Sequence, residues 1–90
     1  MKNGIKDRAK NIVVKTLEET IIEKQSLLGQ MVRTTDEIKK INNSTALTDW
    51  EKGECVEEFE FCLKMDELTL EAFDKKIHTL KNMLIFDSVK

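Results

Sequence analysis

Residues 56–80, VEEFEFCLKMDELTLEAFDKKIHTL, decide the fold because their large apolar side chains recur every three or four positions. An α-helix turns once in about 3.6 residues, so this spacing places those side chains along one stripe of a helix. Continued to the end of the pattern, the apolar members of the stripe are Val56, Phe59, Leu63, Leu70, Phe73, Ile77, Leu80 and Leu84. The stretch predicts a long helix that packs against another surface.

A second stripe with the same spacing occupies the first half of the chain. Its apolar members are Val14, Leu17, Ile21, Leu28, Met31 and Ile38. The chain contains no proline, the commonest helix interrupter, so we expect helices over about residues 5–41 and 49–86, joined by a turn at 42–48. A short link makes two helices of similar length antiparallel neighbours. The prediction is one all-α domain over residues 1–90, an antiparallel, coiled-coil-like two-helix hairpin.

Local signals set the expected ends of the helices. Thr48 and Glu51 have the spacing of a capping box, which predicts the start of the second helix. Thr34 and Glu37 repeat that spacing inside the first helix, soon after Gly29, so a kink or break near Gly29 or Thr34 is an alternative. We favour a continuous helix, because the apolar stripe crosses both positions.

The stripes also predict how the two helices meet. With Val14 and Val56 each at position a of a heptad, Lys24 and Asp66 are polar residues at d positions. Each lies near the middle of its helix, so we expect them to pair and to penalise wrong registers, where either charge would be alone. The alternative is that both side chains reach outward into solvent and never meet.

The neighbouring g positions make each stripe wider than two helices need. They are Val13, Thr20, Leu27, Thr34 and Ile41 in the first helix, and Cys55, Cys62, Thr69, Lys76 and Met83 in the second. A lone hairpin would leave apolar surface in water, so a second copy or a helix of another protein is expected to complete the core. We expect a homodimer that forms a four-helix bundle, because symmetric dimers are the commonest assemblies.

Several residues fall outside the predicted seam and are candidates for partner contact. They are Phe61, Trp50, Ile85, Phe86, Glu54, Glu57 and Glu58. Phe61 takes an outward f position, and exposed aromatic side chains are enriched in interfaces. For Trp50 we favour a plug at the bundle end against Ile38 and Ile41, with an exposed anchor as the alternative. The three glutamates belong to an acidic second helix.

Charge is spread unevenly along the chain, whose net charge is −2. Up to Asn43 there are nine basic and six acidic residues, and from Ser44 onward six basic and eleven acidic ones. We favour electrostatic complementarity between the two helices; an acidic surface for a basic partner is the alternative. No basic excess supports nucleic-acid binding. No apolar run reaches the ~20 residues of a membrane span, and we expect a cytoplasmic protein.

The sequence carries no motif that names a reaction. The glycines are isolated, so no phosphate-binding loop is present. Cys55 and Cys62, seven residues apart, would lie ~10 Å apart on one helix, too far for a disulfide, and we expect buried, reduced thiols. Glu71, Asp74 and His78 share a helix face, but we expect an ordinary solvated face and neither a metal nor a cofactor.

The predicted function is therefore a small, non-enzymatic protein-binding module of the chaperone, adaptor or inhibitor type. It would act through helical packing and its acidic second helix. One alternative is a structural scaffold subunit that stacks into larger assemblies. Another is an oligomer that binds a small anionic ligand between subunits through its N-terminal basic residues, Lys2, Lys6, Arg8, Lys10 and Lys15.

Overall fold

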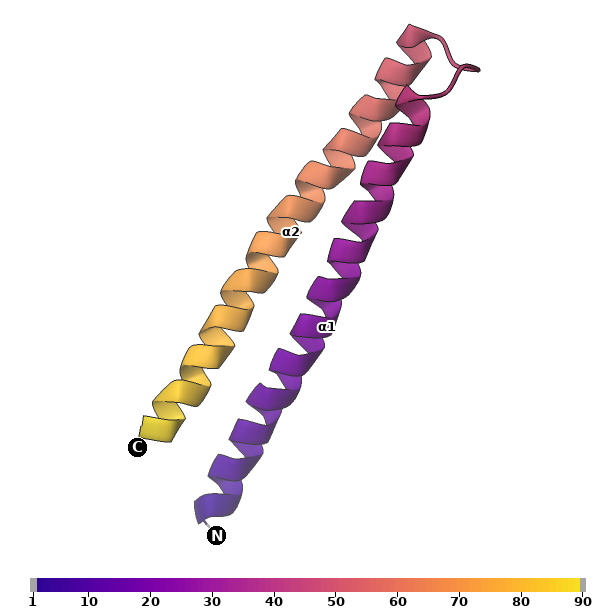
Figure 1. The fold of residues 1–90 in the computed structure, drawn as a ribbon. Coiled ribbons are helices and arrows are strands. Elements are labelled where there is room, and N and C mark those ends of the chain that lie inside the picture. The colour runs from indigo at the N-terminus through magenta and orange to yellow at the C-terminus, as the bar shows by residue number, and fades with distance from the viewer. Residues whose placement is uncertain (1, 90) are drawn as a thin grey trace. The chain divides into compact units, whose positions relative to one another are not determined.

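The chain folds as two long helices that pack against each other as a hairpin, as predicted (Figure 1). The computed structural model describes residues 2–89, and the side chains of residues 7–85. Helix α1 spans Lys2–Asn42 and helix α2 spans Asp49–Val89. Both helices extend about three residues further toward the chain termini than the apolar stripes alone predicted.

Helix α1 runs without a break through Gly29 and Thr34, so the alternative of a divided helix is wrong. The Thr34 hydroxyl donates a hydrogen bond to the Gln30 carbonyl at 3.0 Å, inside the helix, instead of capping a new one. A threonine in mid-helix commonly bonds the carbonyl four residues earlier in this way. Gly29 has no positive φ and follows the ordinary helical path.

Helix α2 begins with the predicted capping box. The Glu51 backbone N–H donates to Thr48 Oγ1 at 3.2 Å, and the Thr48 N–H donates to Glu51 Oε1 at 3.1 Å. These bonds satisfy two backbone donors that a helix start leaves without partners. The bonds from the backbone and hydroxyl of Thr48 lower the pKa of the Glu51 carboxyl below its ordinary value.

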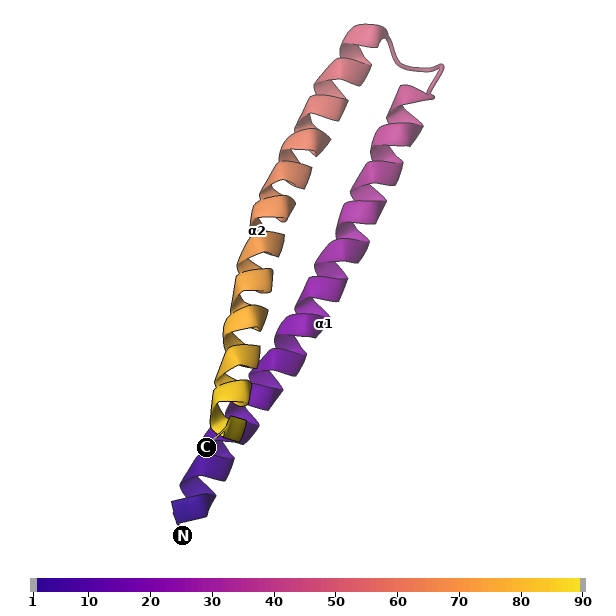
Figure 2. The same cartoon turned by 60° about the vertical axis from the view of Figure 1, so that its left-hand side comes forward.

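The loop at residues 43–48 lets α2 begin beyond the C-terminal end of α1. The Asn43 N–H donates a hydrogen bond to the Lys39 carbonyl at 3.0 Å at the end of α1. The loop then continues past this end before α2 begins. Figures 1 and 2 both show the first turns of α2 extending past the end of α1. Trp50 lies in these turns and is 73% exposed, so the predicted plug against Ile38 and Ile41 is wrong. The reason is that α1 has already ended at this level.

Contacts divide the chain into two units. Unit 1 comprises Met1–Gln25 and Glu71–Lys90, and unit 2 comprises Ser26–Leu70, which contains the loop. In unit 1, Lys24 Nζ lies 2.6 Å from Asp74 Oδ1, so the predicted pairing of Lys24 with Asp66 is wrong. Asp74 follows Asp66 by eight residues, ~12 Å along a helix. The forward offset of α2 explains the difference, because the prediction assumed that helix midpoints face each other.

No apolar side chain among residues 7–85 is fully buried. The one buried side chain in this range is Thr20 in unit 1, which is 1% exposed and donates from Oγ1 to the Thr16 carbonyl at 2.7 Å. Because this bond satisfies the hydroxyl donor, the polar side chain can be buried without the loss of free energy that an unpaired donor would cause. The apolar residues of the seam are only half-buried, since each has one opposing helix.

Helix α2 uses the predicted stripe for its seam. Its a and d residues are all half-buried: Val56, Phe59, Leu63, Asp66, Leu70, Phe73, Ile77, Leu80 and Leu84. In unit 2, however, α1 presents its g and d positions, with Leu27, Thr34 and Ile41 half-buried beside Met31 and Ile38. The a-position residues Leu28 and Thr35 are exposed, which corrects the predicted a and d seam.

Candidate helix-packing interface

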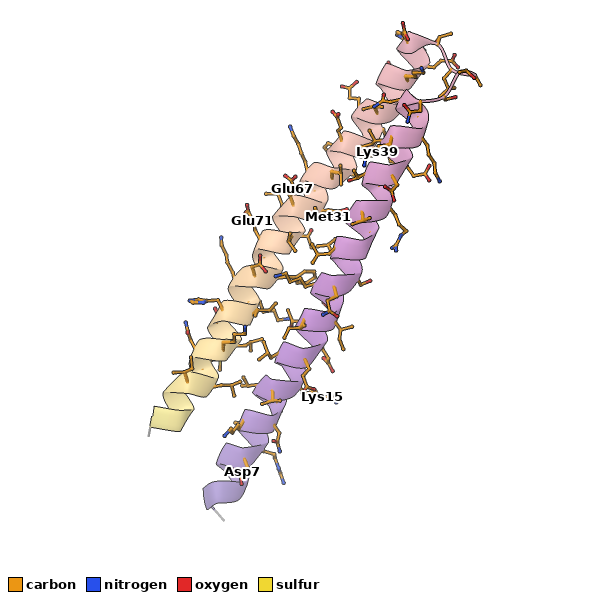
Figure 3. The ribbon with its side chains drawn as sticks, viewed as in Figure 1. Asp7, Lys15, Met31, Lys39, Glu67 and Glu71 are labelled. Atoms are coloured by element: carbon orange, nitrogen blue, oxygen red, sulfur yellow. The ribbon has the colours of Figure 1, made fainter. Side chains whose placement is uncertain are left out.

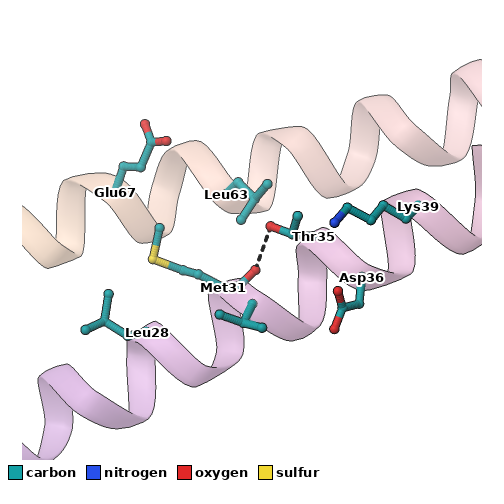
Figure 4. A pocket seen from close by; sticks show the side chains of 8 residues that line it. Leu28, Met31, Thr35, Asp36, Lys39, Leu63 and Glu67 are labelled. Atoms are coloured by element: carbon teal, nitrogen blue, oxygen red, sulfur yellow. Dashed lines mark hydrogen bonds between the residues drawn. The ribbon is translucent and has the colours of Figure 1, made fainter.

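An open groove of about 420 Å³ runs along one side of unit 2 (Figure 4). It is lined by Leu28, Met31, Val32, Thr35, Asp36, Lys39, Leu63 and Glu67. Six of these residues come from α1, and the remaining two, Leu63 and Glu67, come from α2. Its floor is apolar, and its polar groups include both signs of charge.

The groove exists because the apolar surface of α1 is wider than α2 covers. Met31 points toward α2 in Figures 3 and 4 and is half-buried with Leu63. Leu28 and Val32 lie to the side of this contact and are 40% and 61% exposed. They are four residues apart, so they follow one another on the same side of α1. The groove is therefore an edge of the hairpin seam that no helix of the described residues covers.

Asp66 is the polar interruption of the α2 seam. Its side chain is half-buried, and Oδ2 is shielded from solvent without a hydrogen-bond partner in the described part of the chain. Its seam neighbours on α2, Leu63 and Leu70, are apolar. An acceptor left in this state destabilises the fold, because it loses its hydration and gains no bond.

The predicted partner-contact residues are distributed over both units. Trp50 and Phe61 are exposed in unit 2, and Ile85 is exposed in unit 1. The side chain of Phe86 lies outside the described residues. Glu54, Glu57 and Glu58 are exposed, and none of them forms an ion pair or hydrogen bond with residues 7–85.

Phe61 belongs to a larger apolar feature that the sequence analysis missed. Met65 and Leu68 are also exposed, four and seven residues beyond Phe61. This spacing aligns the three side chains on one stripe of α2, on the face opposite its seam. The same spacing is present in the sequence, where it becomes visible only when the three outward positions are considered together. Cys62 beside them is an exposed free thiol, so the prediction that it is buried is wrong; Cys55 is free and half-buried.

The side chains of residues 7–85 contain no group of three or more His, Cys, Asp or Glu that could hold a metal ion. Of the three residues that share a helix face, Asp74 pairs with Lys24 and His78 Nε2 lies 3.1 Å from Asn82 Nδ2. Over the described residues, neither helix is both long and apolar enough to cross a membrane.

Comparison with known proteins gave no match to a family model, to a curated protein or to a solved structure. The function must therefore be argued from the packing surfaces themselves. Those surfaces are the groove of unit 2, the outward stripe on α2 and the exposed acidic residues beside it.

Proposed function

We propose that this protein is a non-enzymatic binding module whose hairpin completes its hydrophobic core against helices from outside the chain. The observation that carries the proposal is the absence of any fully buried apolar side chain among residues 7–85. Two helices alone shield each apolar residue from one direction only. Long helices depend mainly on tertiary packing for their stability, so this hairpin needs a further surface.

The accessible area supports the same proposal. The chain leaves 7344 Å² accessible, about 1,900 Å² more than the ~5,400 Å² expected for a compact monomer of 10.5 kDa. Two copies that hid this excess would bury about 3,800 Å² in total. Obligate homodimer interfaces bury about 2,000–5,000 Å², so the excess is of the size that a dimer removes.

A second copy is the partner that we propose for the groove, which gives a four-helix bundle. In a two-fold dimer the groove of one copy faces the groove of the other, so the same charged residues are present on both sides of the interface. The groove carries Lys39 together with Asp36 and Glu67, and a second copy therefore brings opposite charges as well as like ones. Leu28 and Val32 supply the apolar contact at its open side.

Sedimentation equilibrium of a Val32→Glu variant tests this proposal. A buried glutamate in the interface is strongly unfavourable, so we expect the variant to associate at least tenfold more weakly than the wild type. Ile22→Glu is the matched control, since Ile22 is an equally exposed α1 residue (63% against 61%) that does not line the groove. Equal association of both variants would contradict the groove as the interface. A wild type that sediments at 10.5 kDa would contradict self-association itself.

A further inference from the structure

We infer that the outward face of α2 in unit 2 is a docking surface for a basic amphipathic helix of another protein. Its apolar part consists of four exposed side chains, those of Trp50, Phe61, Met65 and Leu68. With Val56 at heptad position a, all four take b, c or f positions, which lie opposite the seam of α2. We call the b, c and f positions from Trp50 to Leu68 the outer face. Such positions ordinarily carry polar side chains, so large apolar ones exposed there indicate a contact surface.

The apolar residues occupy both ends of the outer face. Trp50 lies at one end, and Phe61, Met65 and Leu68 follow one another at the other end, at spacings of four and three residues. Aromatic and methionine side chains are enriched at protein interfaces. From Trp50 to Leu68 the face extends ~27 Å along α2. One helix of about 18 residues laid along α2 reaches both ends, because rows of side chains at these spacings pack into the grooves of a second helix.

Three glutamates lie between the two apolar ends. Glu54, Glu57 and Glu58 also take b, c or f positions, and their side chains are exposed. None of them forms an ion pair or hydrogen bond with residues 7–85. Lys64 is the one basic residue of the sequence at the positions that make up the outer face. The middle of the outer face is therefore negatively charged.

The fold of the hairpin does not account for these three acids. A helix dipole attracts acidic side chains within the first turn, where α2 already has Asp49 and Glu51. The half-buried seam residues of α2 in unit 2, such as Phe59 and Leu63, lie on the other side of the helix, so the three glutamates lie away from the seam. Their charge is available to a group from outside the chain.

The charge of the outer face determines which occupant fits it. A second copy of the same face would bring the same excess of acid and would be repelled. Lysine and arginine side chains on a partner helix instead neutralise the glutamates, and their methylene stems extend the apolar contact. Apolar residues on the same side of that helix cover Trp50 and the cluster that starts at Phe61. These requirements together describe a basic amphipathic helix.

The outer face shares no residue with the groove of unit 2. The two residues that α2 contributes to the groove, Leu63 and Glu67, take a and e positions. A hairpin that associates with a second copy through the groove therefore keeps its outer face free. Val32→Glu, the variant that disrupts the groove, should bind a helix at the outer face as the wild type does. Loss of self-association and loss of helix binding are thus measured separately.

Trp50 makes this inference directly measurable, because it is the one tryptophan of the chain and lies on the outer face. The probe is a tryptophan-free peptide of about 18 residues, with leucines every three or four positions and lysines elsewhere. We expect it to shift the Trp50 emission to shorter wavelength in a saturable way, because docking removes water from the indole ring. A counterpart peptide with glutamate in place of each lysine should bind at least tenfold more weakly.

Charge-neutral variants test the role of the three glutamates. One variant replaces the acids of the outer face by glutamine, at Glu54, Glu57 and Glu58. We expect its dissociation constant for the basic peptide to rise about tenfold at low salt. The matched control makes the same change of charge at three exposed residues of α1, Glu18, Glu19 and Glu23. This control should bind the peptide as the wild type does, and circular dichroism on each variant confirms that the helices are retained.

Phe61→Ser tests the apolar part of the outer face and should weaken peptide binding about tenfold. Ile22→Ser is its control, because Ile22 is an equally exposed residue of α1 (63% against 64%) and should leave binding unchanged. Equal binding of the basic and acidic peptides, or an equal loss in the glutamine variant and its control, would overturn the inference. A wild type whose Trp50 emission shifts when the protein alone is concentrated would also overturn it, since a second copy would then cover the face.

Discussion

Replacing Asp66 by leucine should stabilise the hairpin, although it removes a charged residue from a highly charged helix. Asp66 takes a seam position of α2 in which every other a and d residue from Val56 to Leu84 is apolar. Its Oδ2 atom is shielded from solvent and accepts no hydrogen bond within the described residues. The substitution removes this acceptor and continues the apolar seam.

The magnitude follows from two contributions. A buried acceptor without a partner destabilises the folded state by about 1–3 kcal/mol, and the substitution removes that loss. A leucine that is buried only in part contributes about 1–2 kcal/mol from apolar area. Because Asp66 is half-buried and its other oxygen has no such shielding, we expect the lower part of the combined range, about 2 kcal/mol. For a domain of this size that raises the melting temperature by about 8–16 °C.

Urea unfolding followed by circular dichroism measures this change, with all proteins at one concentration because association also stabilises. Asp66→Asn retains the shape and the unsatisfied acceptor, and it should gain much less than the leucine variant. Glu71→Leu adds the same side chain at an exposed acidic position of α2 that does not line the groove, and it should change stability by less than about 0.5 kcal/mol. A leucine variant that unfolds at the same or a lower urea concentration would refute the reasoning. That result would mean that Asp66 has a donor in the assembled protein.

Three further predictions concern local features. Thr48→Ala removes the capping hydroxyl of α2 and should destabilise the protein by about 1 kcal/mol in urea unfolding; no change would show that the cap is dispensable. The pKa of the Glu51 carboxyl is lower in the folded state than in the unfolded state. Its contribution to the free energy of unfolding is therefore complete above the unfolded-state pKa and is lost as the pH falls through the folded-state pKa. Urea midpoints of Glu51→Gln should lack this part of the acid dependence. Gly53→Ala, with no atom within 4 Å of the added methyl, and Gly29→Ala, whose methyl meets a flexible side chain at 3.6 Å, should each stabilise by about 1 kcal/mol; a loss at either glycine would reveal a contact from outside the chain.

The seam of α2 was predictable because its a and d positions are apolar throughout, apart from Asp66. The seam of α1 was not, because a, d and g positions all offer residues that tolerate burial. Val14, Ile21 and Leu28 compete there with Val13, Leu27 and Ile41, and periodicity alone does not choose between the two sets. The choice depends on how the opposing helix approaches, which is a tertiary effect.

The loop explains two other differences between sequence and structure. Its polar residues predict a turn, but the spacing of the apolar residues does not indicate that α2 starts beyond the end of α1. This offset leaves Trp50 without a surface to cover and brings Asp74, not Asp66, to Lys24. The exposure of Phe61 was predictable from its outward position, whereas its continuation through Met65 and Leu68 required the three to be considered together.

The central claim is that the two helices do not bury each other's apolar side chains well enough to remain folded alone. Packing against a further surface keeps them helical. The most direct test measures helicity by circular dichroism and mass by sedimentation on the same dilution series of the wild type. The account predicts that helix content falls in the concentration range where the mass falls toward that of a single chain, because dissociation exposes half-buried residues such as Leu27 and Leu70. A single chain that stays fully helical and unfolds cooperatively at the lowest concentrations would contradict it.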